Sequence, residues 1–147
     1  MMTNEQRRAA MYNQGVSDAR ALRNAAEGLT GTEIIDREHS IPAFDPKKDY
    51  TGWPVGSPVT DEGQVWLLLQ PHNAAYYNGR PGNLRALWGL AHTTDPQKAK
   101  GWVDPYGTSG MYMTGECYKA ADGTVYRCRQ DNTVHDAAAL PSGWETV

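Results

Sequence analysis

The chain has 147 residues, enough for one ordinary domain or for two very small ones. Its net charge is −3, with 14 basic and 17 acidic residues, which argues against the basic surface that binds nucleic acid. No apolar run approaches the roughly 18 residues of a membrane-spanning helix, and the N-terminus shows no apolar core of a secretory signal. We therefore expect no nucleic-acid partner, no membrane insertion and synthesis in the cytoplasm.

Residues 3 to 29 carry a helical pattern, and Thr3 with Gln6 has the spacing of a capping box. An apolar stripe follows the 3–4–3 spacing of a coiled-coil seam and predicts self-association. The predicted oligomerisation residues are Val16, Ala19, Leu22, Ala26 and Leu29. Because an isolated helix of this length is marginal in water, it needs a partner. A homo-oligomer, for example a trimer, is favoured, and the alternative is that the helix packs on the chain's own β-structure.

From Pro42 onward Pro and Gly recur every few residues, which is typical of short strands joined by tight turns. Asp122-Gly123 predicts a hairpin with a type I′ turn. With these two residues at its centre, Cys117 faces Cys128. Two buried thiols are favoured over a disulfide there, because no secretory signal is present.

The hairpin region has an earlier copy in the chain. At an offset of 59, Trp53 matches Tyr112 and Gly56 matches Gly115; after one residue is inserted at the turn, the offset becomes 60. Further matches are Gly63 with Gly123, Trp66 with Tyr126, Leu68 with Cys128, Gln70 with Gln130 and Pro81 with Pro141, and the copies close on Trp88 and Trp144. The predicted fold class is mainly β with an N-terminal α-helix and two small tandem antiparallel β-modules. We expect a helical segment at 1–41, a first module at 42–90, a linker at 91–101 and a second module at 102–147.

The second copy resembles a known family. Its pattern is Tyr112-x-x-Gly-Glu-x-Tyr118, then Gly123-x-Val-Tyr-x-Cys128, then Pro141-x-x-Trp144. This is similar to the small carbohydrate-binding modules of families 5 and 12, the chitin- and cellulose-binding β-modules of chitinases and cellulases. The resemblance implies a small β-fold that binds polysaccharide. The family carries exposed rings just after the second hairpin strand, where this chain has Gln70-Pro71 and Gln130-Asp131, so we expect the sugar-contacting rings elsewhere.

The whole chain also resembles small proteins encoded among the tail genes of phages and prophages of Gram-positive gut bacteria. Three segments carry this second resemblance: Trp53-Pro-Val-Gly56, Gln64 to Asn73, and Tyr106 to Met113. It implies a place in the virion tail, with tail-fibre or baseplate proteins as partners.

Protein–sugar recognition needs flat apolar rings surrounded by polar groups. The best candidates are His72, Tyr76 and Tyr77, beside Gln70, in a turn-rich loop after the first hairpin. A second candidate set comprises Trp102, Tyr106 and His135. The alternatives are that Tyr76 or Tyr77 packs against the neighbouring module, that Trp102 is a packing residue, and that Gln70 satisfies backbone groups. Trp66, Trp88, Tyr118, Tyr126 and Trp144 are expected in the core.

Enzymatic interpretations have little support. The sequence has no nucleophile elbow, no phosphate-binding loop and no zinc-ligand spacing. Glu116 and Asp122 could form a glycosidase pair, but so small a module offers little cleft in which to shift a carboxyl pKa, and Glu116 is expected to solvate a strand edge. We expect no catalytic residue, cofactor or metal. The predicted function is non-enzymatic recognition of cell-surface polysaccharide by a tail-associated protein; the alternative is a purely structural tail adaptor or cap.

Overall fold

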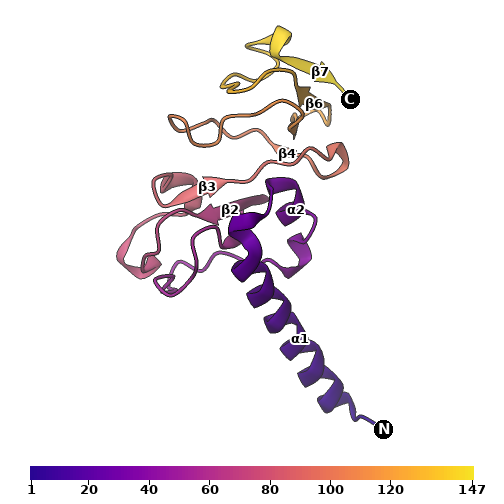
Figure 1. Ribbon diagram of the computed structural model, residues 1–147, viewed down its shortest axis with the longest axis vertical. Coiled ribbons are helices and arrows are strands. Elements are labelled where there is room, and N and C mark those ends of the chain that lie inside the picture. The colour runs from indigo at the N-terminus through magenta and orange to yellow at the C-terminus, as the bar shows by residue number, and fades with distance from the viewer.

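A computed structural model describes all residues, 1–147. A long helix, α1 (Asn4–Ala25), and a short helix, α2 (Gly31–Ile35), precede two small sheets that follow one another along the longest axis of the molecule (Figure 1). The first sheet holds β1 (Pro58–Asp61), β2 (Gln64–Leu68) and β3 (Trp88–Leu90), and the second holds β4 (Lys100–Gly101), β5 (Cys117–Lys119), β6 (Val125–Cys128) and β7 (Trp144–Thr146). The fold is therefore mainly β with an N-terminal helix. Neither helix is long and apolar enough to span a bilayer.

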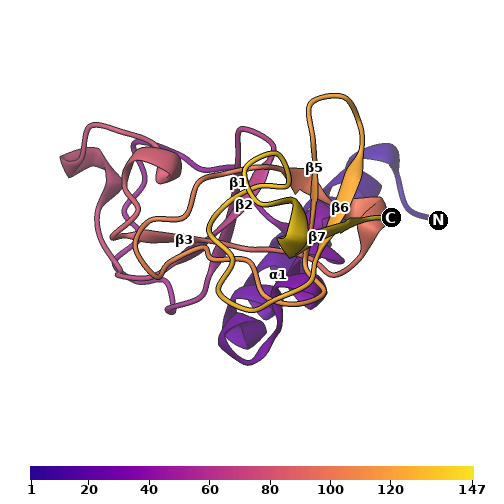
Figure 2. The same ribbon diagram turned by 90° about the horizontal axis from the view of Figure 1, so that it is seen from above.

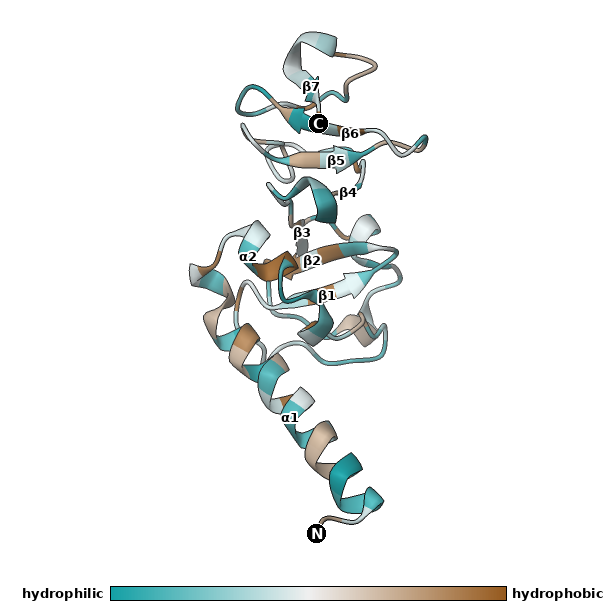
Figure 3. Cartoon of the chain, turned by 90° about the vertical axis from the view of Figure 1, so that its right-hand side faces the viewer, coloured by the Kyte–Doolittle hydropathy of each residue, from teal (hydrophilic) through white to brown (hydrophobic).

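Helix α1 begins with the capping box predicted for Thr3 and Gln6. Only its C-terminal end packs on the body. Leu22 and Ala26 are buried against residues of α2, β2 and the segment after β3, and Leu29 packs at the edge of that cluster. Residues 1–18 are exposed, and this half of the helix projects from the body (Figures 1 and 3).

The oligomerisation seam predicted along this helix is therefore not continuous. Leu22, Ala26 and Leu29 contact the first module, which is the alternative partner, because the apolar groups of α2 and β2 lie within reach. Of the five predicted residues, two are still available for contact with another copy of the helix: Val16, with 39% of its surface exposed, and the half-buried Ala19. Two small side chains provide little apolar area for a helix–helix interface.

The two hairpins use different turns. Glu62 and Gly63 both have positive φ, 51° and 77°, as the central residues of a type I′ turn do. In the second hairpin Tyr118 pairs with Tyr126, and the Ala120 N–H donates to the Thr124 carbonyl at 2.8 Å, which leaves a loop of three residues, 121–123. The Gly123 N–H donates to the Ala120 carbonyl at 2.9 Å, and φ at Gly123 is 88°, as in a type I turn with a glycine bulge.

The type I′ turn predicted for Asp122-Gly123 is therefore wrong, and so is the cysteine register counted from it. Cys117 pairs with Arg127, because the loop has one more residue than a two-residue turn. Cys117 and Cys128 are both buried and free.

The backbone contacts around each hairpin are repeated. Gly56 and Gly115 have φ of 91° and 93°, and their N–H groups donate to the Leu68 and Cys128 carbonyls at 2.7 and 2.8 Å. The third antiparallel strand places Trp88 opposite Leu68 and Trp144 opposite Cys128. On the other side, Ala43 pairs in parallel with Thr60, as Gly101 does with Lys119.

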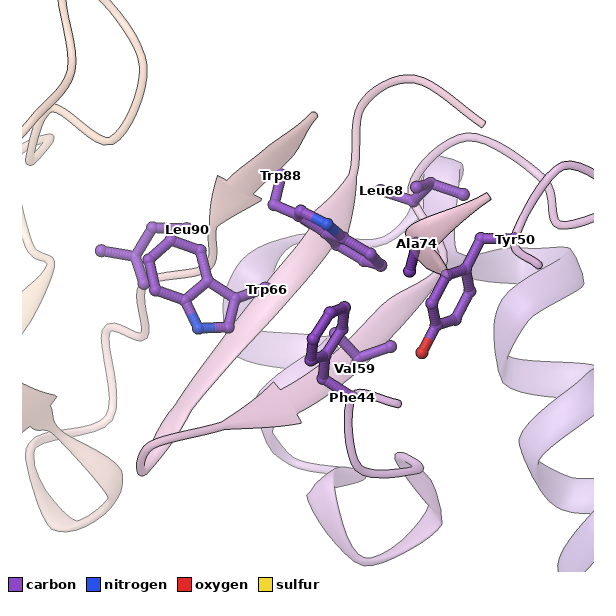
Figure 4. Close-up of a cluster of buried hydrophobic side chains, with 8 residues drawn as sticks. All are labelled: Phe44, Tyr50, Val59, Trp66, Leu68, Ala74, Trp88 and Leu90. Carbon is purple, nitrogen blue, oxygen red and sulfur yellow. The ribbon is translucent and has the colours of Figure 1, made fainter. Parts of the chain in front are cut away.

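A triad of rings closes each module. In the first, Phe44 stacks on Tyr50 (6.1 Å, 12°), and Trp88 meets both rings edge-on (Figure 4). In the second, Trp102 stacks on Tyr112 (4.9 Å, 11°), and Trp144 lies across both at 78° and 71°. Tyr112 thus corresponds in space to Tyr50, whereas the sequence alignment paired it with Trp53. The Trp53 ring instead lies under the Arg23 guanidinium, whose carbon is 4.3 Å from the centroid of the ring.

The segment predicted as a linker, 91–101, contributes to both modules. Ala91 packs in the apolar cluster that contains Leu22 at the end of α1. Thr93 pairs with Cys117, and Lys100–Gly101 forms β4. Between them the His92 ring stacks on Tyr112, with centroids 3.7 Å apart.

Glu116 lies beside His92, where the two modules meet. Its Oε1 is 3.2 Å from His92 Nδ1 and accepts a hydrogen bond from the Met113 N–H at 2.7 Å. Its predicted role of solvating a strand edge is wrong, because the Thr93–Cys117 pairing brings His92 against it. The two modules therefore share a polar and aromatic joint.

Gly31→Ala tests how closely α2 approaches this joint. A Cβ at Gly31 would lie 2.2 Å from the His92 carbonyl oxygen, whereas one at Gly15 meets nothing within 4 Å. We expect Gly31→Ala to lower the free energy of unfolding by roughly 1–3 kcal/mol in urea titrations. Gly15→Ala is the matched control, and it should raise α-helical circular dichroism without loss of stability. Equal stability of the two variants would contradict the packing.

Stability should also fall at alkaline pH. Burial raises the pKa values of the Tyr112 and Tyr50 hydroxyls and of the Cys117 thiol. A group whose pKa is higher in the folded state stabilises that state below its unfolded pKa, about 10 for tyrosine, and loses this contribution as the pH rises further. The free energy of unfolding should therefore begin to decline above about pH 8.5, the ordinary pKa of a thiol, and should fall further above about pH 10, where the decline is less steep in Tyr112→Phe. An identical slope in that variant would contradict the role of Tyr112.

Candidate functional site

The loop between β2 and β3 presents two adjacent tyrosines. The Asn73 side chain accepts a hydrogen bond from the Ala75 N–H at 3.0 Å and starts a short 3₁₀ turn, η3 (Ala74–Tyr76). Ala74 is buried and anchors this turn, while Tyr76 and Tyr77 are 84% and 44% exposed. Seen from above, the loop extends away from the β5–β6 hairpin (Figure 2). Neither tyrosine is buried between the modules.

His72 does not belong to the exposed row predicted with these tyrosines. It is only 6% exposed and lies beside Trp88 and Tyr50, since it contributes to the core of the first module. Its Nδ1 is 2.7 Å from the Gln70 carbonyl oxygen. The His72 ring meets Tyr77 edge-on, with centroids 5.3 Å apart, so it supports Tyr77 from beneath.

Gln70 is exposed at the start of the same loop. Its Nε2 donates to the Ala86 carbonyl at 2.9 Å, so it satisfies a backbone group, as the alternative interpretation predicted.

In the second candidate set only Tyr106 and His135 are exposed. Trp102 is half-buried within the closing triad, and its Nε1 donates to Asp104 Oδ1 at 2.7 Å, which makes it a packing residue. Tyr106 is 60% exposed on a turn that pairs it with Ser109. His135 is exposed, and its carbonyl accepts a hydrogen bond from Trp144 Nε1.

A groove beside the second hairpin was missed from the sequence. We call it the aromatic groove; it has a volume of about 410 Å³, and its lining includes Trp102, Tyr118, Lys119, Ala120, Tyr126 and Asp136. Tyr126, expected in the core, is half-buried and stacks on Tyr118 at 5.4 Å. The sequence does carry one indication of this groove. The second copy has the small residue Ala120 at the position where the first copy has Asp61.

No group of three or more His, Cys, Asp or Glu side chains is placed to hold a metal ion. No protein-family model matches the chain, and no curated protein matches it significantly. What the protein does is therefore inferred from its own side chains.

Trp102→Ala distinguishes a packing role from a ligand-binding role. Removing this ring takes one packing partner from Tyr112 and one from Trp144 and leaves a cavity in the closing triad, so we expect a loss of about 3 kcal/mol in the free energy of unfolding. The control, Tyr106→Ala, removes an exposed ring and should change stability by less than about 0.5 kcal/mol. Similar small losses in both variants would show that Trp102 does not support the module.

Proposed function

We propose that this protein is a non-enzymatic carbohydrate-binding protein whose sugar-contacting surface is Tyr76 with Tyr77. The observation that carries the proposal is the exposure of two adjacent rings on a loop whose backbone is fixed by Asn73 and Ala74. Tyrosine combines an apolar face, on which the C–H groups of a sugar ring can stack, with a hydroxyl that can bond its oxygens. Because His72 holds the Tyr77 ring from beneath, little conformational entropy is lost when a ligand stacks there.

The ligand class fits the form of this surface. Two rings on an open loop contact one or two sugar units, which suits weak binding to a repeated polymer on a cell surface. The amide groups of Asn78 and Gln70 lie in the same exposed loop and can accompany the rings. Several copies acting together would raise the apparent affinity.

We further propose a relationship to the carbohydrate-binding modules of families 5 and 12 and a place in a phage or prophage tail. The short hairpin followed by a Pro-led turn and a closing Trp supports the first part. The projecting half of α1 supports the second, because an exposed helix on a rigid body suits attachment to fibre or baseplate proteins.

A purely structural adaptor is the second candidate function. The exposure of residues 1–18 also favours it, since an unpartnered helix is a ready protein-binding element. In that role Tyr76 and Tyr77 would contact protein, where exposed tyrosines often become hot spots.

Binding to polysaccharides separates these two functions. In pull-down assays with insoluble chitin, cellulose and host cell-wall polysaccharide, we expect at least one to retain the protein. Replacing both Tyr76 and Tyr77 with Ala should weaken that binding by roughly tenfold or more, since each ring contributes on the order of 1 kcal/mol. Tyr12→Ala with Tyr106→Ala is the matched control, because it also removes two exposed rings.

Retention by none of the polysaccharides would contradict carbohydrate binding and favour the adaptor. Retention that is unchanged in the Tyr76/Tyr77 variant would contradict the proposed surface.

A further inference from the structure

The two modules differ at the place of the aromatic groove. In the first module the Arg80 guanidinium lies over the Phe44 ring, 5.7 Å from its centroid. It also pairs with Asp61, whose oxygens accept from Arg80 Nε at 2.9 and 3.0 Å. An arginine of the same chain thus occupies this place, between a ring and a carboxylate.

In the second module both members of that ion pair are missing. Ala120 follows β5 where Asp61 ends β1, and Leu140 precedes Pro141 as Arg80 precedes Pro81. The ring remains, because Trp102 takes the position of Phe44 in the closing triad. The aromatic groove is therefore the counterpart of a site that an arginine fills in the first module.

The groove retains the chemistry for a guanidinium. Tryptophan attracts a cation over its face more strongly than phenylalanine does, and a planar guanidinium also stacks well. Tyr126 forms a second wall, and the half-buried Asp136 supplies a carboxylate. Lys119 opposes a cation, but its side chain is exposed and can turn toward solvent.

The chain also contains unpaired arginines. Arg7 and Arg8 are exposed on the projecting half of α1, and their guanidinium groups make no ion pair or hydrogen bond within the chain. The N-terminus and the second sheet lie at opposite ends of the molecule (Figure 1), so these arginines cannot reach the groove of their own copy. Residues 1–25 hold four arginines and two acidic residues, whereas acidic residues are in excess over the whole chain. The helix and the body are therefore complementary in charge.

We propose that the aromatic groove receives Arg7 or Arg8 from a second copy of the chain. This contact is head-to-tail, so it can propagate into a ring or a chain of molecules. It assigns the free half of α1 a partner other than a second helix. It is independent of the proposed carbohydrate binding, which involves Tyr76 and Tyr77 in the loop between β2 and β3 of the first module.

Sedimentation velocity over a concentration series at low ionic strength tests the proposal. The wild-type mass should rise with concentration and fall when salt is added, because the contact is a partly exposed charge interaction. Arg7→Glu with Arg8→Glu should weaken association by roughly tenfold or more. The matched control, Arg37→Glu with Arg129→Glu, makes the same change in net charge at exposed arginines and should associate as the wild type does.

Two substitutions at one groove position should act in opposite directions. Ala120→Asp restores the carboxylate of the first module and should strengthen association, whereas Ala120→Arg fills the groove from within and should abolish it. A mixture of Ala120→Arg with the Arg7/Arg8 variant should form dimers and nothing larger, since only one functional contact remains. A monomeric wild type, or Ala120→Arg molecules that associate as the wild type does, would overturn the proposal.

Discussion

The packing of one tryptophan onto two stacked rings is the interaction on which each small module depends. Trp88 and Trp144 stand at the first residue of the last strand in their sheets and lie across the rings beneath. Modules of this size are near the lower limit for independent folding, because they bury only a modest share of their surface. Large rings compensate, since each buries far more apolar area than an aliphatic side chain. The loops that bear the exposed groups depend on this frame for their positions.

The second constraint is the joint between the modules. His92 stacks on Tyr112 and lies beside Glu116, while Gly31 of α2 packs against the His92 backbone. One residue therefore links the helical segment, the first sheet and the second triad. This arrangement explains why the segment after β3 is not a free linker, and it makes the end of α1 part of the body while its first half stays exposed.

Local sequence patterns predicted the capping box, the hairpins and the closing tryptophans, because each depends on residues close in sequence. The turn at Gly123 was misjudged, since Asp-Gly serves both two-residue and three-residue loops, and a difference of one residue moved Cys117 away from Cys128. Tyr50 was overlooked because extra residues separate it from Gly56. The burial of His72 and the partial exposure of Tyr126 depend on residues distant in sequence, so neither could be predicted from the local pattern.

The two copies share a frame and differ in what that frame presents: exposed tyrosines on the first, an open aromatic groove on the second. The triads and the joint together should make one cooperative body from which half of α1 projects. Native-state hydrogen exchange measures whether the two modules open together. We predict that amides of β2 and β6 exchange with the same free energy of opening, while those of residues 5–17 exchange rapidly. A distinctly lower free energy for β6 would show that the modules open separately, and strong protection along the whole of α1 in the monomer would show that its first half does not project freely.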